Sequence, residues 1–140
     1  MHRSSTLLNV QLSAVVTGLR FGERIVIADA GLPVPPGVPT LDLAITAGLP
    51  TVPDVVRALR ESLVIEAAWV AEEMSKVNIE SRDKVAELFE GTELLQDVPH
   101  QDIEDSLPTA KLIVQTGDVT PYGNVVLVGG LDFFQLGMAD

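Results

Sequence analysis

Residues 25–33 of this 140-residue chain read IVIADAGLP, and this stretch decides the class of fold. Ile25 to Ala28 form a short apolar run rich in β-branched residues, which is typical of a strand buried on both faces. The run ends at Asp29, and the segment from Asp29 to Pro39 holds four prolines and two glycines, which predicts a stiff loop. In open α/β sheets, ligands bind outside the carboxyl ends of the strands, so Asp29 is a candidate ligand contact.

The segments on either side of this strand predict helices that alternate with short strands. Asn9 is a suitable N-cap for the first helix and Ser81 for the third. Residues 64–74 are ambiguous, because their alanines and glutamates favour a helix whereas Ile65, Trp69 and Val70 suit a buried strand. Helices are expected over residues 10–19, 52–62 and 81–90, and strands over residues 41–45, 111–114 and 124–128. This alternation predicts an α/β layered domain.

The length of the chain predicts one domain over residues 1–140. Hydrophobic residues make up 46% of the chain, but no run of about 18 uncharged apolar residues could cross a membrane. Residues 1–9 lack the charged-then-apolar pattern of a signal peptide. We therefore expect a protein of the cytoplasm.

The charge of the chain limits its partners. It carries 20 acidic and 9 basic residues, a net charge of −11. An acidic surface repels phosphate groups, so we expect neither nucleic acid nor a membrane as a partner.

The sequence lacks most familiar catalytic signatures. It has no cysteine, so disulfides and thiol catalysis are excluded. No phosphate-binding loop, dinucleotide fingerprint, nucleophile elbow or metal-spaced histidine pair is present, so we expect no cofactor and no metal. The two histidines, His2 and His100, are few for a mechanism that needs two proton carriers at neutral pH.

Each candidate polar residue also has a purely structural interpretation. Asp29 could accept a hydrogen bond from its own loop backbone in an Asx turn. His100 could be a surface or helix-cap residue, Tyr122 a core aromatic, and Asn124 a turn residue before a strand. We expect the glutamates at 66, 72 and 73 to form a solvated or interfacial charge cluster.

Five short motifs resemble, in order and spacing, those of one family. Asp29–Pro33 resembles the DAGLP segment of bacterial ribose pyranases, and Thr120–Asn124 resembles their S/T-P-Y-x-N motif, followed by a strand and a Gly-x-x-Phe ending at 130–133. The remaining matches are Leu8-Asn9, the glutamate- and alanine-rich stretch over 66–74, and Pro99-His100-Gln101. From about residue 7 to residue 133, the chain thus resembles the D-ribose pyranase / L-fucose mutarotase (RbsD/FucU) family.

The resemblance implies a fold and an assembly. The fold is a three-layer α/β/α domain with a central mixed sheet, which favours a strand near residues 66–71. The assembly is a homo-oligomer, a pentameric ring or a decamer of two such rings, with sites at subunit interfaces. In this arrangement one chain would supply Asp29, and its neighbour would supply Tyr122, Asn124 and His100.

The resemblance also implies an activity, the interconversion of pyranose and furanose forms of a monosaccharide, most directly ribose. Ring opening needs a base for the anomeric hydroxyl and an acid for the ring oxygen. The implied substrate-binding residues are Asp29, His100, Tyr122 and Asn124, and His100 is the implied catalytic residue. No cofactor is needed for this isomerase reaction.

One departure from the family pattern concerns proton transfer. The family's principal catalytic histidine lies eight residues before the motif Asp29, and Phe21 stands at this position. His2 or Glu23 could replace it as the proton carrier, or Phe21 could be a hydrophobic plug or stack on a less polar ligand. The alternatives are therefore an isomerase with re-routed proton transfer, a non-catalytic monosaccharide-binding protein, and an unrelated acidic α/β scaffold.

Overall fold

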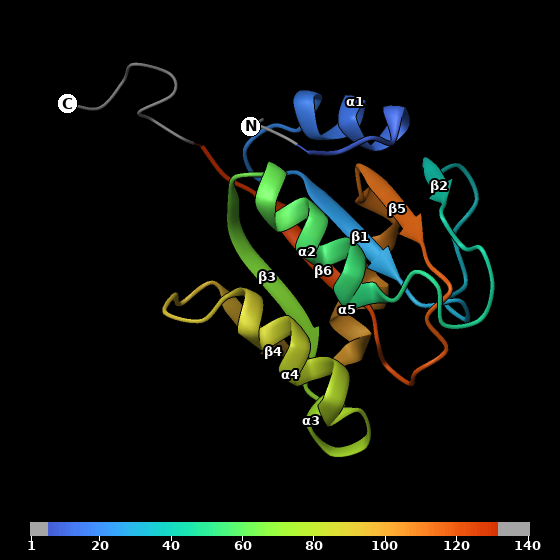
Figure 1. Ribbon diagram of the computed structural model, residues 1–140, viewed down its shortest axis with the longest axis vertical. Helices are drawn as coiled ribbons and strands as arrows, with labels where there is room; N and C mark the ends of the chain where they lie inside the picture. The colour runs from blue at the N-terminus through green and yellow to red at the C-terminus, as the bar shows by residue number, and fades with distance from the viewer. Residues whose placement is uncertain (1–5, 132–140) are drawn as a thin grey trace.

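A computed structural model describes residues 6–131 and places β1 (Arg24–Ala28) inside a six-stranded sheet. The last four residues of β1 are buried, as expected for a strand that is covered on both faces. The strand order is β2-β5-β1-β6-β3-β4 (Figure 1). The other strands are β2 (Thr40–Asp42), β3 (Ile65–Ala71), β4 (Leu95–Val98), β5 (Leu112–Gln115) and β6 (Val125–Gly129).

The sheet is mixed because one strand runs against its two neighbours. β6 is antiparallel to both β1 and β3, whereas the pairs β1–β5, β2–β5 and β3–β4 are parallel. The register pairs Ile27 of β1 with Val125, the first residue of β6. The start of β6 therefore lies beside the carboxyl end of β1.

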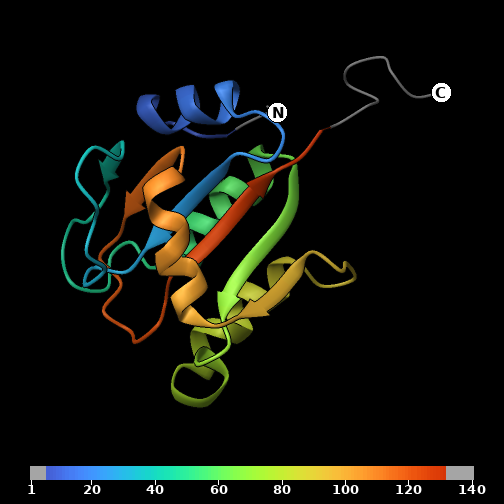
Figure 2. The same ribbon diagram turned by 180° about the vertical axis from the view of Figure 1, so that it is seen from behind.

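Helices cover both faces of the sheet, as the α/β/α expectation requires. On one face α2 (Val52–Ser62) packs against α4 (Ile79–Leu88), while α5 (His100–Ser106) crosses the opposite face against β3 (Figures 1 and 2). α1 (Val10–Gly18) lies over one end of the sheet, and the short helices α3 (Met74–Val77) and η1 (Leu107–Thr109) connect longer elements. None of the helices in residues 6–131 has both the length and the apolar character needed to span a bilayer.

The helix caps explain two of the boundaries. The side chain of Asn9 accepts a hydrogen bond from the backbone N–H of Leu12, which fixes the start of α1 as expected. Thr51 and Asp54 form a reciprocal capping box at the start of α2.

Several expected boundaries were wrong or incomplete. Ser81 does not cap its helix, because α4 already begins at Ile79 with Asn78 before it. The strand expected over 41–45 ends at Asp42, whose side chain bends the chain by accepting from the N–H of Ala44. Within the ambiguous segment, residues 65–71 form strand β3, in which Ile65, Ala68, Val70 and Ala71 are buried.

Candidate functional site

The sheet topology brings polar residues from distant parts of the sequence to one edge. β1 and β5 are parallel, so their carboxyl ends lie side by side. β3 and β4 run opposite to β6, so their carboxyl ends also lie at the start of β6. The residues that follow these strands, and those that precede β6, therefore meet at this carboxyl edge, where α/β sheets bind ligands.

Asp29 follows β1 and has two structural roles at this edge. Its Oδ1 accepts from the N–H of Gly31 at 3.0 Å, so the expected Asx turn is present. Its own N–H donates to Oδ1 of Asn124 at 2.7 Å. The Asx turn does not remove Asp29 from the site, because the carboxyl group also lines the pocket.

The electrostatic surroundings raise the pKa of Asp29. Burial of the carboxyl group has the largest effect, and the negative charge of Asp118 adds to it. Hydrogen bonds from the backbone of Gly31 and Gly123 oppose this rise in the pKa. A carboxylate with a raised pKa is a stronger proton acceptor than an ordinary aspartate.

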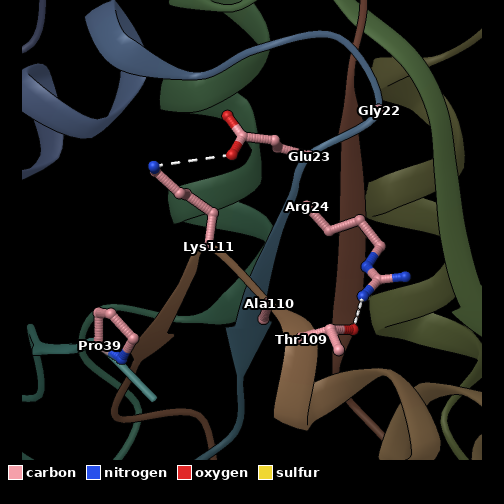
Figure 3. A pocket seen from close by; sticks show the side chains of 7 residues that line it. All are labelled: Gly22, Glu23, Arg24, Pro39, Thr109, Ala110 and Lys111. Atoms are coloured by element: carbon pink, nitrogen blue, oxygen red, sulfur yellow. Dashed lines mark hydrogen bonds and ion pairs between the residues drawn. The ribbon is translucent and has the colours of Figure 1, made fainter. Parts of the chain in front are cut away.

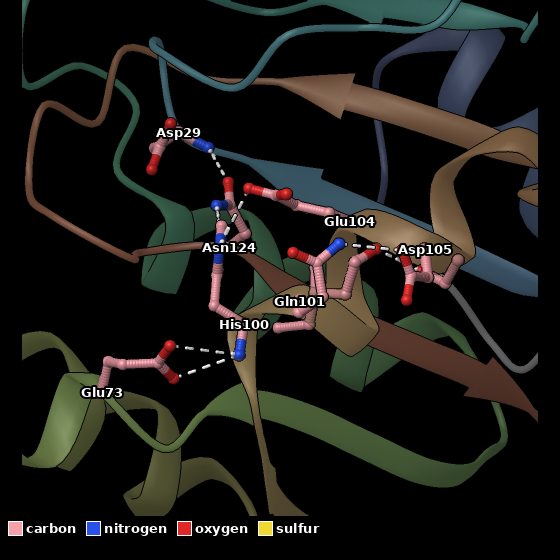
Figure 4. A network of polar contacts seen from close by, with 9 residues as sticks. Asp29, Glu73, His100, Gln101, Glu104, Asp105 and Asn124 are labelled. Atoms are coloured by element: carbon pink, nitrogen blue, oxygen red, sulfur yellow. Dashed lines mark hydrogen bonds and ion pairs between the residues drawn. The ribbon is translucent and has the colours of Figure 1, made fainter.

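Asn124 links Asp29 to His100. The residue is 1% exposed, and its Nδ2 lies 3.0 Å from Nε2 of His100 (Figure 4). On the other side of the ring, Nδ1 of His100 lies 3.3 Å from Oε1 of Glu104. A turn residue at the surface would not be buried in this way, so Asn124 has a defined place in the site.

Tyr122 contacts His100 and has an unusual backbone conformation. The two rings meet edge to face, with centroids 5.1 Å apart and planes at 78°. Tyr122 is 41% exposed, so it is not a core aromatic residue. Its φ of 55° is rare for a bulky residue, and such strain often occurs at ligand sites.

One open pocket of about 370 Å³ is lined by Asp29, His100, Tyr122 and Asn124. The remaining lining residues are Glu104, Pro121 and those of the loop after Asp29. The pocket therefore presents carboxylate, imidazole, amide and phenol groups together, a set that can both donate to and accept from hydroxyl groups.

Asp118 supports this edge and was missed by sequence reasoning. Its side chain is buried and accepts from the N–H groups of Val52 and Thr120, both at 2.9 Å. Its backbone C=O accepts from the N–H of Ala30, beside Asp29. Asp118 thus ties α2 to the two loops that carry the pocket. Its position shortly after a strand, like that of Asp29, was an available signal.

Two other supporting residues lie between β3 and α4 and hold the segments that carry Tyr122 and His100. Asn78 donates from Nδ2 to the hydroxyl of Thr120 and to the C=O of Pro121, each at 2.9 Å. Glu73 accepts from the N–H of His100 at the start of α5 (Figure 4). Glu73 was expected in a charge cluster with Glu66 and Glu72, which are exposed, but it has this specific structural contact instead.

The other end of β1 holds Phe21, at the position where the resemblance implied a catalytic histidine. Phe21 lies before β1, on a turn held by the N–H of Gly22, which donates to the C=O of Gly129. Phe21 is 59% exposed, so the interpretation as a hydrophobic plug packed against the loop after the helix is wrong within a single chain. A five-residue strand spans about 17 Å, so Phe21 is remote from the pocket of its own chain.

Glu23 also lies at this amino end and is already engaged. Its Oε1 accepts from the N–H of Arg20 at 2.6 Å, and its Oε2 lies 3.6 Å from Nζ of Lys111. Glu23 and Lys111 line a second pocket at this end of the sheet, which Figure 3 shows. In it, the guanidinium of Arg24 donates to the hydroxyl of Thr109. Glu23 therefore does not serve the pocket of its own chain, and His2 lies outside the described residues.

One expectation about the assembly was wrong. Asp29, His100, Tyr122 and Asn124 were expected to come from two neighbouring chains, but all four lie in the same chain and are linked by direct contacts. Parallel and antiparallel pairing at one sheet edge explains this result. Within residues 6–131, no group of three or more acidic or histidine side chains could hold a metal ion.

The fold and the pocket define an α/β protein with a polar site at the carboxyl edge of a mixed sheet. The model of the RbsD / FucU transport protein family matches residues 2–132 of this chain. The chain belongs to this family.

Individual relatives agree with this assignment. A D-ribose pyranase from Pseudomonas putida is 40% identical over 131 residues, which cover 94% of this chain and 99% of the relative. The structure of RbsD from Bacillus subtilis, complexed with D-ribose, has a TM-score of 0.87 at 34% identity and covers 95% of this chain and 100% of that chain. A fucose mutarotase from Streptococcus pneumoniae shares the fold, with a TM-score of 0.75 at 19% identity over 89% of this chain and 94% of that one.

Proposed function

We propose that this chain is an isomerase that interconverts the pyranose and furanose forms of D-ribose. The observation that carries the proposal is the convergence of Asp29, His100, Tyr122 and Asn124 on one pocket. The relative from Pseudomonas putida is a D-ribose pyranase, and the similar Bacillus subtilis structure holds D-ribose. The donor and acceptor groups of the pocket suit a small polyhydroxylated ligand.

The reaction needs two proton transfers and no cofactor. A base takes the proton of the anomeric hydroxyl while an acid protonates the ring oxygen, and the bond between C1 and the ring oxygen breaks. The open-chain aldehyde then recloses through a different hydroxyl group, with the proton transfers reversed. Positioned acid–base groups contribute about 10²–10⁴-fold to such steps.

The pocket residues have distinct roles in this proposal. His100 exchanges protons with the sugar, since imidazole can act as acid or base near neutral pH. Asp29 accepts hydrogen bonds from two hydroxyl groups, and Asn124 donates from Nδ2. Tyr122 packs its half-exposed ring against a sugar face and offers its phenol to a hydroxyl.

We propose further that the protein works as a homo-oligomeric ring, pentameric or decameric, in the cytoplasm. The position of Phe21 supports this assembly, because an exposed phenylalanine remote from its own pocket can cover the pocket of another copy. A head-to-tail contact of this kind closes into a ring when the rotation permits it. The absence of cysteine is compatible with a reducing compartment.

A second candidate function follows from Phe21. Phenylalanine carries no proton, so the family position that should hold the catalytic histidine cannot take part in acid–base chemistry. A non-catalytic protein that binds a monosaccharide would keep the pocket at the carboxyl end and lose turnover. The two candidates therefore differ in rate and not in binding.

Saturation-transfer NMR on D-ribose separates the two candidates. We expect the protein to accelerate exchange between the pyranose and furanose signals in proportion to its concentration. Calorimetric titration with D-ribose on the same preparation measures binding. Binding without acceleration would support the non-catalytic candidate, and the absence of both would refute each of them.

A further inference from the structure

A continuous line of polar contacts crosses the pocket from Asp29 to Glu104. The N–H of Asp29 meets Oδ1 of Asn124, Nδ2 of Asn124 meets Nε2 of His100, and Nδ1 of His100 faces Glu104 (Figure 4). The first two distances are 2.7 and 3.0 Å, and the third is 3.3 Å. Glu104 was not among the residues singled out from the sequence.

The backbone N–H of Asp29 determines which atoms donate and which accept along this line of contacts. A backbone N–H can only donate, so the atom of Asn124 that faces Asp29 is its oxygen. The amide NH₂ then faces His100 and can only donate, so Nε2 of His100 is an acceptor without a hydrogen. The remaining hydrogen of a neutral imidazole is therefore on Nδ1, the ring nitrogen that lies 3.3 Å from Oε1 of Glu104.

From this geometry we propose that Glu104 is a positioning residue that holds His100 in the Nδ1–H tautomer. The carboxylate accepts the Nδ1 hydrogen, and Nε2 keeps its lone pair toward Asn124 and the pocket. In many sites, the partner of one imidazole nitrogen sets the state of the other in this way. This inference extends the proposed function, because Nε2 is then the atom that takes the proton of the sugar hydroxyl.

Glu104 also matters at the moment of proton transfer. When Nε2 accepts a proton from the anomeric hydroxyl, both ring nitrogens become donors and Asn124 has to release Nε2. The imidazolium then keeps its Nδ1 hydrogen on Glu104, whose negative charge stabilises the positive ring. His100 is the one histidine in residues 6–131, so this support acts on the proton carrier that replaces the missing family histidine.

A neighbouring pair on the same helix provides a matched control. Nε2 of Gln101 donates to Oδ1 of Asp105 at 2.9 Å, one residue further along α5 with the same spacing of four. Figure 4 shows both pairs. Glu104 lines the pocket, whereas Asp105 does not. The side chain of His100, which Glu104 contacts, is 13% exposed. Removing the charge at 105 therefore changes the helix in the same way without touching His100.

The direct test is ¹⁵N NMR of the histidine ring in full-length protein that also carries His2→Gln, so that only His100 is observed. Protonated and unprotonated ring nitrogens resonate far apart, so the spectrum reports the tautomer without any measurement of activity. We expect Nδ1 protonated and Nε2 unprotonated at neutral pH in this background and with Asp105→Asn. With Glu104→Gln, which can accept or donate, the amide of Asn124 is the one remaining constraint on Nε2, so we expect a second population with the hydrogen on Nε2 to appear beside the Nδ1–H form. Protonation on Nε2 in the background protein, or an unchanged spectrum in Glu104→Gln, would overturn the inference.

Ring-exchange kinetics add a second readout. We expect Glu104→Gln to lower kcat for ribose exchange about tenfold while KM stays within about twofold, and Asp105→Asn to leave both unchanged. A rise in KM with unchanged kcat would mean that Glu104 binds the sugar directly, which would contradict a positioning role. If the unmodified protein fails to catalyse exchange, the proposed function fails, and the tautomer spectra still decide the role of Glu104.

Discussion

The two ends of β1 differ in chemistry although only five residues separate them. At the carboxyl end, Asp29 is joined to Asn124 and His100 in a buried, directional set of contacts. At the amino end, Phe21 is exposed and Glu23 is occupied by Arg20 and Lys111. The comparison shows that side-chain and backbone contacts organise the carboxyl end, whereas the amino end carries an exposed apolar side chain where a proton carrier was expected.

Phe21→His gives the largest expected effect, because it restores an imidazole at the amino end. We expect the ribose exchange rate to rise by about 10²–10⁴-fold, the usual contribution of a positioned acid–base group. Saturation-transfer NMR measures the rate, and Phe21→Leu is the matched control without a titratable group. If Phe21→His and Phe21→Leu gave equal rates, the amino end would have no part in the reaction.

Asn124→Leu removes the centre of the carboxyl-end contacts. The N–H of Asp29 then loses its acceptor in a partly buried place, which costs about 1 kcal/mol of unfolding free energy. We expect this loss in urea denaturation and the loss of measurable ribose binding in calorimetry. Unchanged affinity for ribose would show that the sugar binds somewhere else.

Tyr122→Gly separates binding from stability. Glycine adopts a positive φ without strain, and this relief offsets the loss of a half-exposed ring, so we expect the unfolding free energy to stay within about 1 kcal/mol of the original. Ribose affinity should fall about tenfold, or about 1.4 kcal/mol, because the ring no longer packs on the sugar. Val119→Gly, at an exposed position on the same loop, should leave affinity unchanged.

The raised pKa of Asp29 predicts a small effect with a definite sign. Since the folded state favours the protonated carboxyl, the charged form lowers stability above the folded pKa, and this penalty disappears as the pH falls toward the unfolded value of about 3.9. Asp29→Asn should therefore be more stable than the unmodified protein at pH 7, with the advantage shrinking toward pH 4. Urea denaturation at both pH values measures the difference.

Asp54 is the control with the opposite sign. The backbone N–H of Thr51 lowers the pKa of Asp54, so its stabilising effect is present above the unfolded pKa and is lost as the pH falls. Asp54→Asn should cost stability at pH 7 and little at acidic pH. Parallel behaviour of the two variants would contradict the assigned environment of Asp29.

Much of the fold followed from local sequence patterns. The buried strand before Asp29, the helix capped by Asn9 and the helix at 52–62 lie where the sequence predicted them. β4 was missed because LQDV at 95–98 forms a short edge strand with two exposed residues, which gives little apolar signal. The start of α4 was missed because Ser81, a frequent cap, lies inside the helix.

The sequence singled out the four residues proposed for the site, but it did not give their arrangement in space. Motifs identified Asp29, His100, Tyr122 and Asn124, yet only the antiparallel direction of β6 shows that one chain brings them together. The spacing of four between His100 and Glu104 on a helix was a usable signal for their contact. The role of Asn78 depends on loops that meet only in the folded chain, so sequence reasoning had no basis for it. The position of Asp118 shortly after β5 was an available signal that sequence reasoning did not use.

The most direct test of the ribose isomerase proposal compares ribose ring exchange in the unmodified protein and in His100→Gln. Saturation-transfer NMR at equal protein concentrations gives both rates above the uncatalysed exchange. We predict clear acceleration by the unmodified protein and a loss of about 10²-fold in His100→Gln. No acceleration by the unmodified protein, or equal acceleration by both, would contradict the assignment of this pocket as the catalytic site.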